Sequence, residues 1–286
     1  MRAVNAGGRR SHLRHVVWLA GALALGPAPA GEARALVVGA ELSPETKAGF
    51  SHYIDAVEAR IAQNVGAKDF LYSCPTPEQR AQLRAGEVLI WPGNALKNAK
   101  DMKVPGGLVQ DWVGLIFVRG IDVRQARAMM QDYAHYKDFY KPEVIDSREI
   151  AHHGADFDVF LRLYKRQFVT VVLNATYAIH YGDEDASRFS IASRSTRIAE
   201  AKNSSGPYTE EEPVGHDSGL LWALNSYWRF EEGDGGVYAQ CEAISLSRDI
   251  PFGFAWLKGF VQKFPRESMQ NTLEGTRRAL VNSRGR

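Results

Sequence analysis

Four charged residues lie inside otherwise apolar strand patterns, and they are the side chains in this sequence best suited to chemistry. Arg162 and Glu242 each interrupt an apolar run, and Arg194 and Arg197 lie in a third such segment. Facing a cavity, these side chains could orient the polar head of a ligand or act as an acid or base. Facing the outer side of a sheet, they would pair with cross-strand neighbours. The alternation of apolar and polar side chains does not determine which face of each strand points inward. Both interpretations therefore stay open, and no catalytic residue is assigned.

Motifs for nucleotide, metal and hydrolase chemistry are absent. No G-x-G-x-x-G follows an expected strand, and neither a G-x-x-x-x-G-K-[ST] loop nor a G-x-S-x-G elbow occurs. His152 and His153 are adjacent on an expected strand, so they point to opposite faces and cannot bind one metal ion together. His180 and His216 have no partner at ligand spacing. We therefore expect neither a metal nor a cofactor.

Aromatic and apolar residues are better placed for a binding role. The candidates for lining a cavity are Trp222, Leu224, Trp228, Phe230, Trp256 and Phe260. The first four share one face of segment 219–230 if that segment is a strand, and the last two lie one helical turn apart in segment 252–264. Such stripes often form packed core. A helix that does not close fully on a sheet would instead leave an apolar cavity of roughly several hundred Å³, with Arg162 and Glu242 as its candidate polar residues.

The elements expected to position these residues are mainly strands. Seven strand patterns occur, at 108–118, 143–150, 157–164, 168–181, 188–199, 219–230 and 237–248. A helix at 123–136 separates the first two, and the other strands follow without a helix between them. One apolar face and one more polar face per strand indicate an antiparallel sheet covered on one side. The absence of βαβ alternation disfavours a doubly wound parallel sheet.

Helices are expected before and after these strands along the chain. Near the C-terminus, segment 252–264 is apolar, and Pro265 is expected to begin a helix. The apolar stripe of that helix is Met269, Leu273, Thr276 and Leu280. Residues 44–65 and 77–84 predict two N-terminal helices, with a polar loop at 94–107. Residues 36–107 are too poor in core residues to fold alone, so we expect this N-terminal extension to dock onto residues 108–284.

The order of strand, helix, six strands and long terminal helix resembles the START-like helix-grip superfamily, which includes lipid-transfer domains, polyketide cyclase/aromatase-like proteins and ubiquinone-binding proteins. The segments that carry the resemblance are Gly114–Val118, Asp132–Tyr136, Leu161–Asn174, Ser195–Glu200, Gly236–Pro251 and Pro265–Ser268. The resemblance implies an α+β fold in which a curved antiparallel sheet of about seven strands wraps a long C-terminal helix. It implies ligand binding in general and does not select a ligand.

The first 30 residues have the pattern of a secretory signal peptide. Four Arg precede a ten-residue apolar run, Val16–Leu25, which is shorter than the roughly 20 residues needed to span a bilayer. Small-x-small sites predict cleavage after Ala30 or Ala35. We expect an exported protein, periplasmic or secreted, with no integral membrane span. Export would permit a disulfide between Cys74 and Cys241, but we favour two free thiols, with Cys241 a small buried residue in a strand and Cys74 in a loop.

Composition excludes several classes of protein. The chain has 286 residues, of which 45% are hydrophobic and 24% charged, which is ordinary for a globular domain. Removal of residues 1–30 leaves 31 Lys and Arg against 33 Asp and Glu, a net charge of −2 that argues against nucleic-acid binding.

Three functions remain. The favoured one is an exported binder of an apolar small molecule or lipid. The alternatives are a cyclase- or hydrolase-like enzyme that uses cavity residues such as Arg162 and Glu242, and a scaffold for interactions in the cell envelope.

Overall fold

An eight-stranded antiparallel sheet forms the centre of the protein, in the order β2-β3-β10-β9-β7-β6-β5-β4. The computed structural model describes residues 39–64, 70–71, 75–93, 104–166, 170–203, 206, 208–249 and 258–283. The strands of this sheet are β2 (Leu89–Pro92), β3 (Gly107–Arg119), β4 (Val144–His153), β5 (Asp156–Arg166), β6 (Thr170–Asp185), β7 (Arg188–Glu200), β9 (Ala223–Gly233) and β10 (Gly236–Arg248). A small separate sheet pairs β1 (Ala40–Glu41) with β8 (His216–Asp217).

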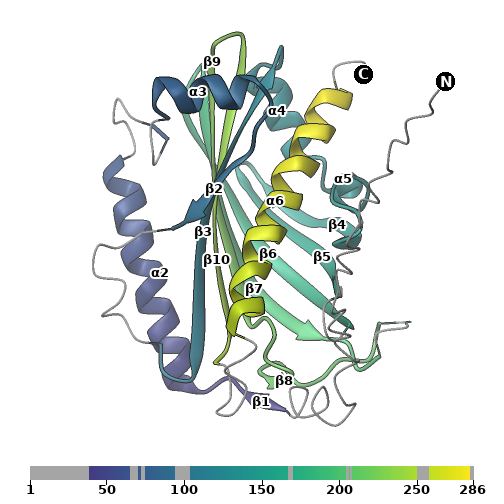
Figure 1. The fold of residues 1–286 in the computed structure, drawn as a ribbon. Helices are drawn as coiled ribbons and strands as arrows, with labels where there is room; N and C mark the ends of the chain where they lie inside the picture. The colour runs from purple at the N-terminus through teal and green to yellow at the C-terminus, as the bar shows by residue number, and fades with distance from the viewer. Residues whose placement is uncertain are drawn as a thin grey trace, which may run out of the picture.

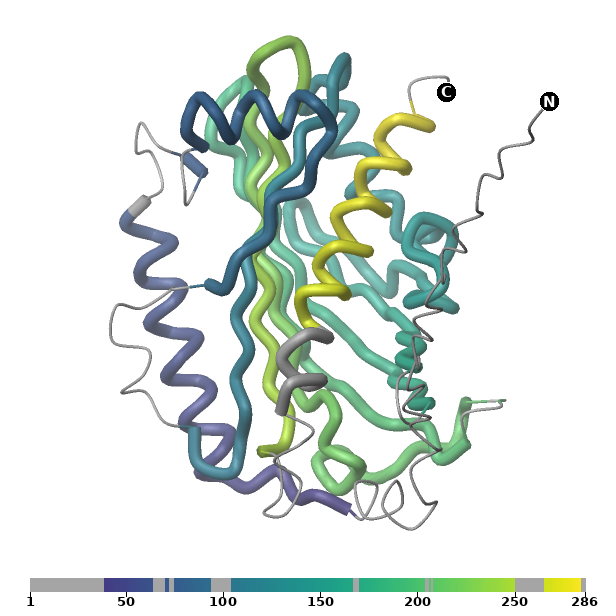
Figure 2. The backbone as a smooth tube through the Cα atoms, in the orientation of Figure 1, coloured from purple at the N-terminus to yellow at the C-terminus, as the bar shows by residue number. Residues whose placement is uncertain are grey.

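Helices cover both faces of the large sheet (Figure 1). They are α2 (Pro44–Asn64), α3 (Pro77–Arg84), α4 (Val123–Met130), α5 (Tyr136–Phe139) and α6 (Lys258–Ser283), with a 3-10 turn at Tyr133–His135. Figures 1 and 2 show α6 running across one face of the strongly twisted sheet, while α2 lies on the other side of β3. We call the face toward α6 the inner face and the face toward α2 the outer face. The predicted α+β helix-grip class is confirmed.

The packing of α6 on the inner face follows its apolar stripe. Met269, Leu273 and Leu280 belong to this stripe, and all three are buried between α6 and the sheet. Gly114 of β3 lies directly under this stripe, and a Cβ atom there would come within 2.3 Å of Leu273 Cδ1. A side chain at residue 114 would therefore push α6 away from the sheet, which explains a glycine in the middle of a strand.

The start of α6 differs from the prediction. The helix begins at Lys258, so the expectation that it begins at Pro265 is wrong. Proline cannot donate a backbone hydrogen bond and is unfavourable inside a helix, which is why the sequence pattern placed the boundary there. Pro265 is instead the eighth residue of α6, and it is one of the residues that line the cavity described below.

The predicted helix 123–136 is also interrupted. An Asp122 capping box begins α4, and the helix ends at Met130. The Met130 carbonyl accepts hydrogen bonds from the Tyr136 hydroxyl at 2.6 Å and the Tyr181 hydroxyl at 2.8 Å. These two hydroxyls satisfy the carbonyl of the last residue of α4, and a 3-10 turn follows at Tyr133–His135.

The N-terminal region contributes to both the sheet and its outer cover. Phe50, Ile54 and Val57 of α2 pack against Ile244 and Leu246 of β10 in one buried cluster. Strand β2, which the sequence patterns did not reveal, pairs with β3 at the sheet edge. It has only four residues and ends in a proline, so its alternation is too short to be read.

Candidate functional site: an apolar cavity under the C-terminal helix

A cavity of about 350 Å³ lies between the inner face of the sheet and α6. Its floor comes from strands β3 to β7, β9 and β10, one wall from α6, and another wall from residues 130–144. Most of the lining is apolar and includes Val159, Leu161, Leu163, Leu173, Ile191 and Met269. A concave, mainly apolar space with a few polar groups is the form of a small-molecule site.

The cavity reaches the surface beside two chain segments. Residues 219–221 and 248–249 belong to its lining, and Leu220 is 41% exposed. The exposed lining residue shows that the cavity meets solvent on this side, which we call the rim. This rim lies near the N-terminal part of α6, because Pro265 is also part of the lining.

Three tyrosines form one wall with their hydroxyl groups already paired. The Tyr133 and Tyr181 hydroxyls lie 2.8 Å apart, and Tyr136 and Tyr181 both donate to the Met130 carbonyl. Burial raises the pKa of each of these phenols above its ordinary value, so they stay neutral. What they present to the cavity is therefore mainly apolar ring surface.

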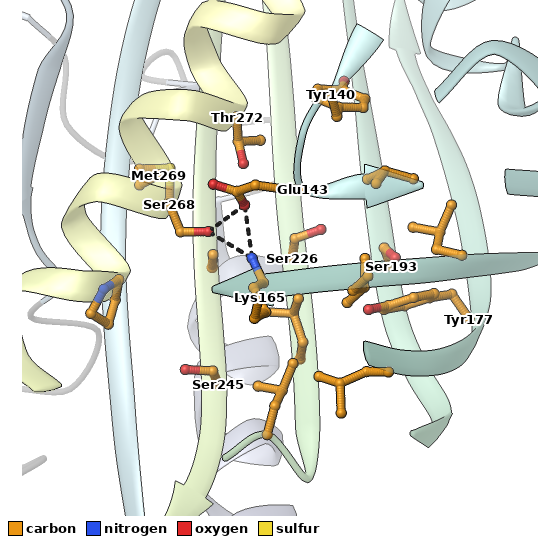
Figure 3. Close-up of a pocket in the computed structure, with 18 of the residues that line it drawn as sticks. Tyr140, Glu143, Lys165, Tyr177, Ser193, Ser226, Ser245, Ser268, Met269 and Thr272 are labelled. Carbon is orange, nitrogen blue, oxygen red and sulfur yellow. Dashed lines mark hydrogen bonds and ion pairs between the residues drawn. The ribbon is translucent and has the colours of Figure 1, made fainter. Parts of the chain in front are cut away.

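One charged cluster borders the cavity (Figure 3). Lys165 Nζ donates to Glu143 Oε2 at 2.7 Å and to Ser268 Oγ of α6 at 3.1 Å. Ser268 Oγ donates to the same carboxylate at 2.9 Å, and Asn271 Nδ2 donates to its other oxygen at 2.8 Å. Burial by itself would raise the pKa of Glu143, but the Lys165 charge and these hydrogen bonds lower it overall. The cluster is thus an internally neutralised ion pair that fastens α6 to the end of β5.

Two of the predicted cavity residues line the cavity. Leu224 and Trp228, both on β9, are part of its floor. Phe230 is on the same face but is fully buried and stacked on Phe189, with ring centroids 4.5 Å apart. It supports Trp228, whose ring centroid lies 5.7 Å from that of Phe230, and is not itself part of the lining. Trp256 lies outside the described residues, and for Phe260 only the backbone of α6 is described.

The prediction that Trp222 shares a face with Trp228 is wrong. Strand β9 begins at Ala223, so the alternation extrapolated from the strand does not apply to Trp222. Its ring is buried in the outer cluster with Tyr227 and α2, and its Nε1 donates to Asp217 Oδ1 at 3.1 Å.

The charged candidates Arg162 and Glu242 also lie on the outer face. Arg162 Nε donates at 2.8 Å to the Asn174 side chain, its direct cross-strand neighbour. Glu242 is fully buried and receives two hydrogen bonds, of 2.7 and 2.5 Å, from Arg60 Nη2 of α2. The idea that these residues stand in the cavity is wrong, because each alternates with cavity-lining neighbours on its strand. Arg162 has the cross-strand partner considered from the sequence, whereas Glu242 pairs with a helix.

Arg194 and Arg197 are each paired with a glutamate carboxylate. Arg194 Nε donates to Glu58 of α2 at 2.5 Å, and Arg197 pairs with Glu211. None of the four charged residues that the sequence singled out borders the cavity.

The most informative polar residues of the cavity were not singled out from the sequence. Tyr177 lies on the apolar face of β6, at even spacing from Leu173 and Ile179. This two-residue period in the sequence could have identified Tyr177 as a residue on the cavity side. Glu143 and Lys165 come from the ends of two paired strands, and Ser268 from a helix far along the chain. No local pattern could have joined these three.

Cys241 is buried in β10, and Cys74 lies outside the described residues, so the pairing that export would permit is not tested. Within the described ranges, no three His, Cys, Asp or Glu side chains gather as a metal-binding group. No helix in this part of the chain is long and apolar enough to cross a membrane.

No family model matches this chain, and no curated protein matches it. Among solved structures, a STAR-related lipid transfer protein fragment from Xanthomonas axonopodis is 13% identical, with a TM-score of 0.44 over 62% of this chain and 95% of that one. Human STARD10 is 10% identical, with a TM-score of 0.43 over 71% and 80%. The di-domain ARO/CYC StfQ from the steffimycin biosynthetic pathway is 10% identical, with a TM-score of 0.41 over 63% and 53%. The strand order and the position of α6 across the inner face identify the chain's own architecture as a helix-grip fold.

Proposed function

We propose that this protein binds an apolar small molecule or lipid chain in the cavity under α6. The observation that carries the proposal is the cavity itself, about 350 Å³ of mainly apolar space that α6 covers without filling. Protein interiors are normally close-packed, and a void of this size is unfavourable unless something occupies it.

The enzyme alternative is less well supported. Arg162 and Glu242, the residues considered for it, face away from the cavity. Glu143 does border the cavity, but its lowered pKa makes it a weak base, and Lys165 already neutralises its charge. The scaffold alternative gives no reason for an apolar cavity between the sheet and α6.

Export is a second part of the proposal. The basic start, the short apolar run and the small-x-small sites support it, and these residues lie outside the described ranges. N-terminal sequencing of the purified protein should find Gly31 or Leu36 first. An intact Met1 or Arg2 on cytosolic protein would contradict export without bearing on the cavity.

Binding can be tested with N-phenyl-1-naphthylamine, a neutral probe whose fluorescence rises in apolar surroundings. Wild-type protein should bind it saturably at one site. Leu161→Trp adds a large ring to the cavity floor and should reduce its affinity at least tenfold. Ile150→Trp is the matched control, since Ile150 is 54% exposed on edge strand β4 and should tolerate the same ring without loss of binding. Absence of saturable binding by folded wild-type protein would contradict the proposal.

A further inference from the structure

Among the residues that the structure describes, the buried Tyr177 hydroxyl in the cavity has no hydrogen-bond partner. Tyr177 is 5% exposed, and no described residue accepts from or donates to its hydroxyl. Figure 3 shows its oxygen directed toward the middle of the cavity. Buried polar side chains nearly always have a partner, so an orphaned hydroxyl beside an open space indicates that the partner comes from outside the protein. This differs from Tyr133, Tyr136 and Tyr181, whose hydroxyls are all paired within the chain.

Further hydroxyl groups continue from Tyr177 across the cavity floor. Ser193 of β7 and Ser226 of β9 are direct cross-strand partners, and both line the cavity. Tyr177 lies on the adjacent strand β6, diagonal to Ser193, because Tyr177 pairs with Ser195 and Ser193 pairs with Ile179. The hydroxyls of Tyr177, Ser193 and Ser226, which we call the hydroxyl band, therefore cross three neighbouring strands within an otherwise apolar surface.

Among the described residues that line the cavity, positive and negative charges are equal in number. The Lys165 ammonium is already paired with Glu143 at 2.7 Å, and at the rim Arg248 and Asp249 supply one charge of each sign. Burial raises the pKa of Tyr177, so its phenol stays protonated and able to donate. A carboxylate or ammonium on a ligand would have to leave water, and the described lining residues carry no excess of the opposite charge to compensate, which makes its burial costly.

We propose that the ligand is a neutral, mainly apolar molecule that carries a carbonyl or hydroxyl oxygen in its body, and that Tyr177 and the hydroxyl band recognise this oxygen. The inference rests on the proposed binding function and adds the chemical class of the ligand. Fatty acids, whose polar group is a charged carboxylate, belong to the disfavoured class.

Three shape-matched probes test the class, namely 2-acetylnaphthalene, 2-ethylnaphthalene and 2-naphthoate, each titrated calorimetrically at pH 7. Wild-type protein should bind the ketone about tenfold more tightly than the hydrocarbon, the ratio expected of one net hydrogen bond. Transfer from water alone would favour the hydrocarbon, so this order requires a polar contact in the cavity. The naphthoate anion should bind more weakly than the ketone.

Tyr177→Phe should remove the preference for the ketone and leave the affinity for the hydrocarbon unchanged. Tyr227→Phe is the matched control, because the Tyr227 hydroxyl lies on the outer face and donates to Glu58 at 2.7 Å. It should keep the preference. Thermal unfolding gives a second readout, since Tyr177→Phe removes an unpaired hydroxyl and should be at least as stable as wild type, whereas Tyr227→Phe should be less stable.

The two levels of the proposal fail in different ways. Equal affinity for ketone and hydrocarbon, tighter binding of naphthoate, or an unchanged preference in Tyr177→Phe would overturn the ligand class while apolar binding stands. A Tyr177→Phe variant as destabilised as Tyr227→Phe would also overturn it, because the hydroxyl would then have a partner in the protein. Failure of all three naphthalenes and of N-phenyl-1-naphthylamine to bind would overturn the binding function and the ligand class together.

Discussion

On β10, Cys241 and Ala243 face the cavity, whereas Glu242 between them faces α2 on the other side of the sheet. Both faces are buried, but different groups bury them. The outer face holds ion pairs such as Glu242 with Arg60 and Arg194 with Glu58, and helix α2 supplies a partner for each. The inner face is mainly apolar, and α6 leaves space above it. On β7 and β10, the charged residues Arg194 and Glu242 therefore mark the surface on which α2 docks, and none of the four charged residues considered from the sequence lies on the cavity face.

The largest difference between the faces is expected for the two tryptophans. Trp222 is packed and hydrogen-bonded, so Trp222→Ala should lower the free energy of unfolding by about 3–5 kcal/mol, as for a ring removed from a filled core. Trp228 borders an existing space, so Trp228→Ala should cost about 2 kcal/mol or less and change probe affinity by more than Trp222→Ala does. Urea unfolding and probe titration on both variants measure this. Equal large losses of stability would mean that the inner face is packed core.

The Glu242–Arg60 pair tests the outer face alone. Glu242→Ala leaves Arg60 without its carboxylate under α2 and should cost about 3 kcal/mol, the scale of a broken buried pair. The affinity for N-phenyl-1-naphthylamine should be unchanged in the folded variant. Loss of probe binding with stability intact would place Glu242 in the ligand site and undo the division between the faces.

The cluster at Glu143 should give the inner face its own pH dependence. The folded-state pKa of Glu143 lies below the ordinary value of 4.5, so its ionised form stabilises the protein above that pH. This stability is lost as the pH falls through the folded-state pKa. Glu143→Gln should therefore cost about 2 kcal/mol at pH 7, and wild type and variant should converge well below pH 4.5. A difference independent of pH would show that the charge of Glu143 has no part in holding α6.

The smallest effect is expected at Arg162. Its side chain is 20% exposed, and its guanidinium pairs on the outer face with Asn174 and, at 3.5 Å, with Asp146. Arg162→Ala should cost about 1 kcal/mol or less, as for other partly exposed pairs, without effect on probe affinity. A change in affinity with unchanged stability would contradict the outer-face assignment.

Much of the fold could be predicted because its signals are local. Residues 77–84 were recognised as the helix α3, and the Met269–Leu280 stripe marks the buried side of α6. Each of the seven strand patterns corresponds to a strand of the sheet, although several bounds shift by a few residues. The cavity residues were harder to predict. Whether a side chain reaches the cavity depends on the residue at which its strand begins and on which face of the sheet each helix covers. Trp222 lies one residue before β9, and that single residue places it on the opposite side from the one predicted.

The account depends most on one claim, that α6 covers a cavity which holds a neutral apolar guest. Native mass spectrometry of the protein incubated with 2-acetylnaphthalene, then gently desalted, measures this directly. Wild-type protein should retain one molecule of the ketone per chain, and Leu161→Trp should retain none while staying folded. Wild-type protein without bound ketone, or equal retention by both proteins, would contradict the account.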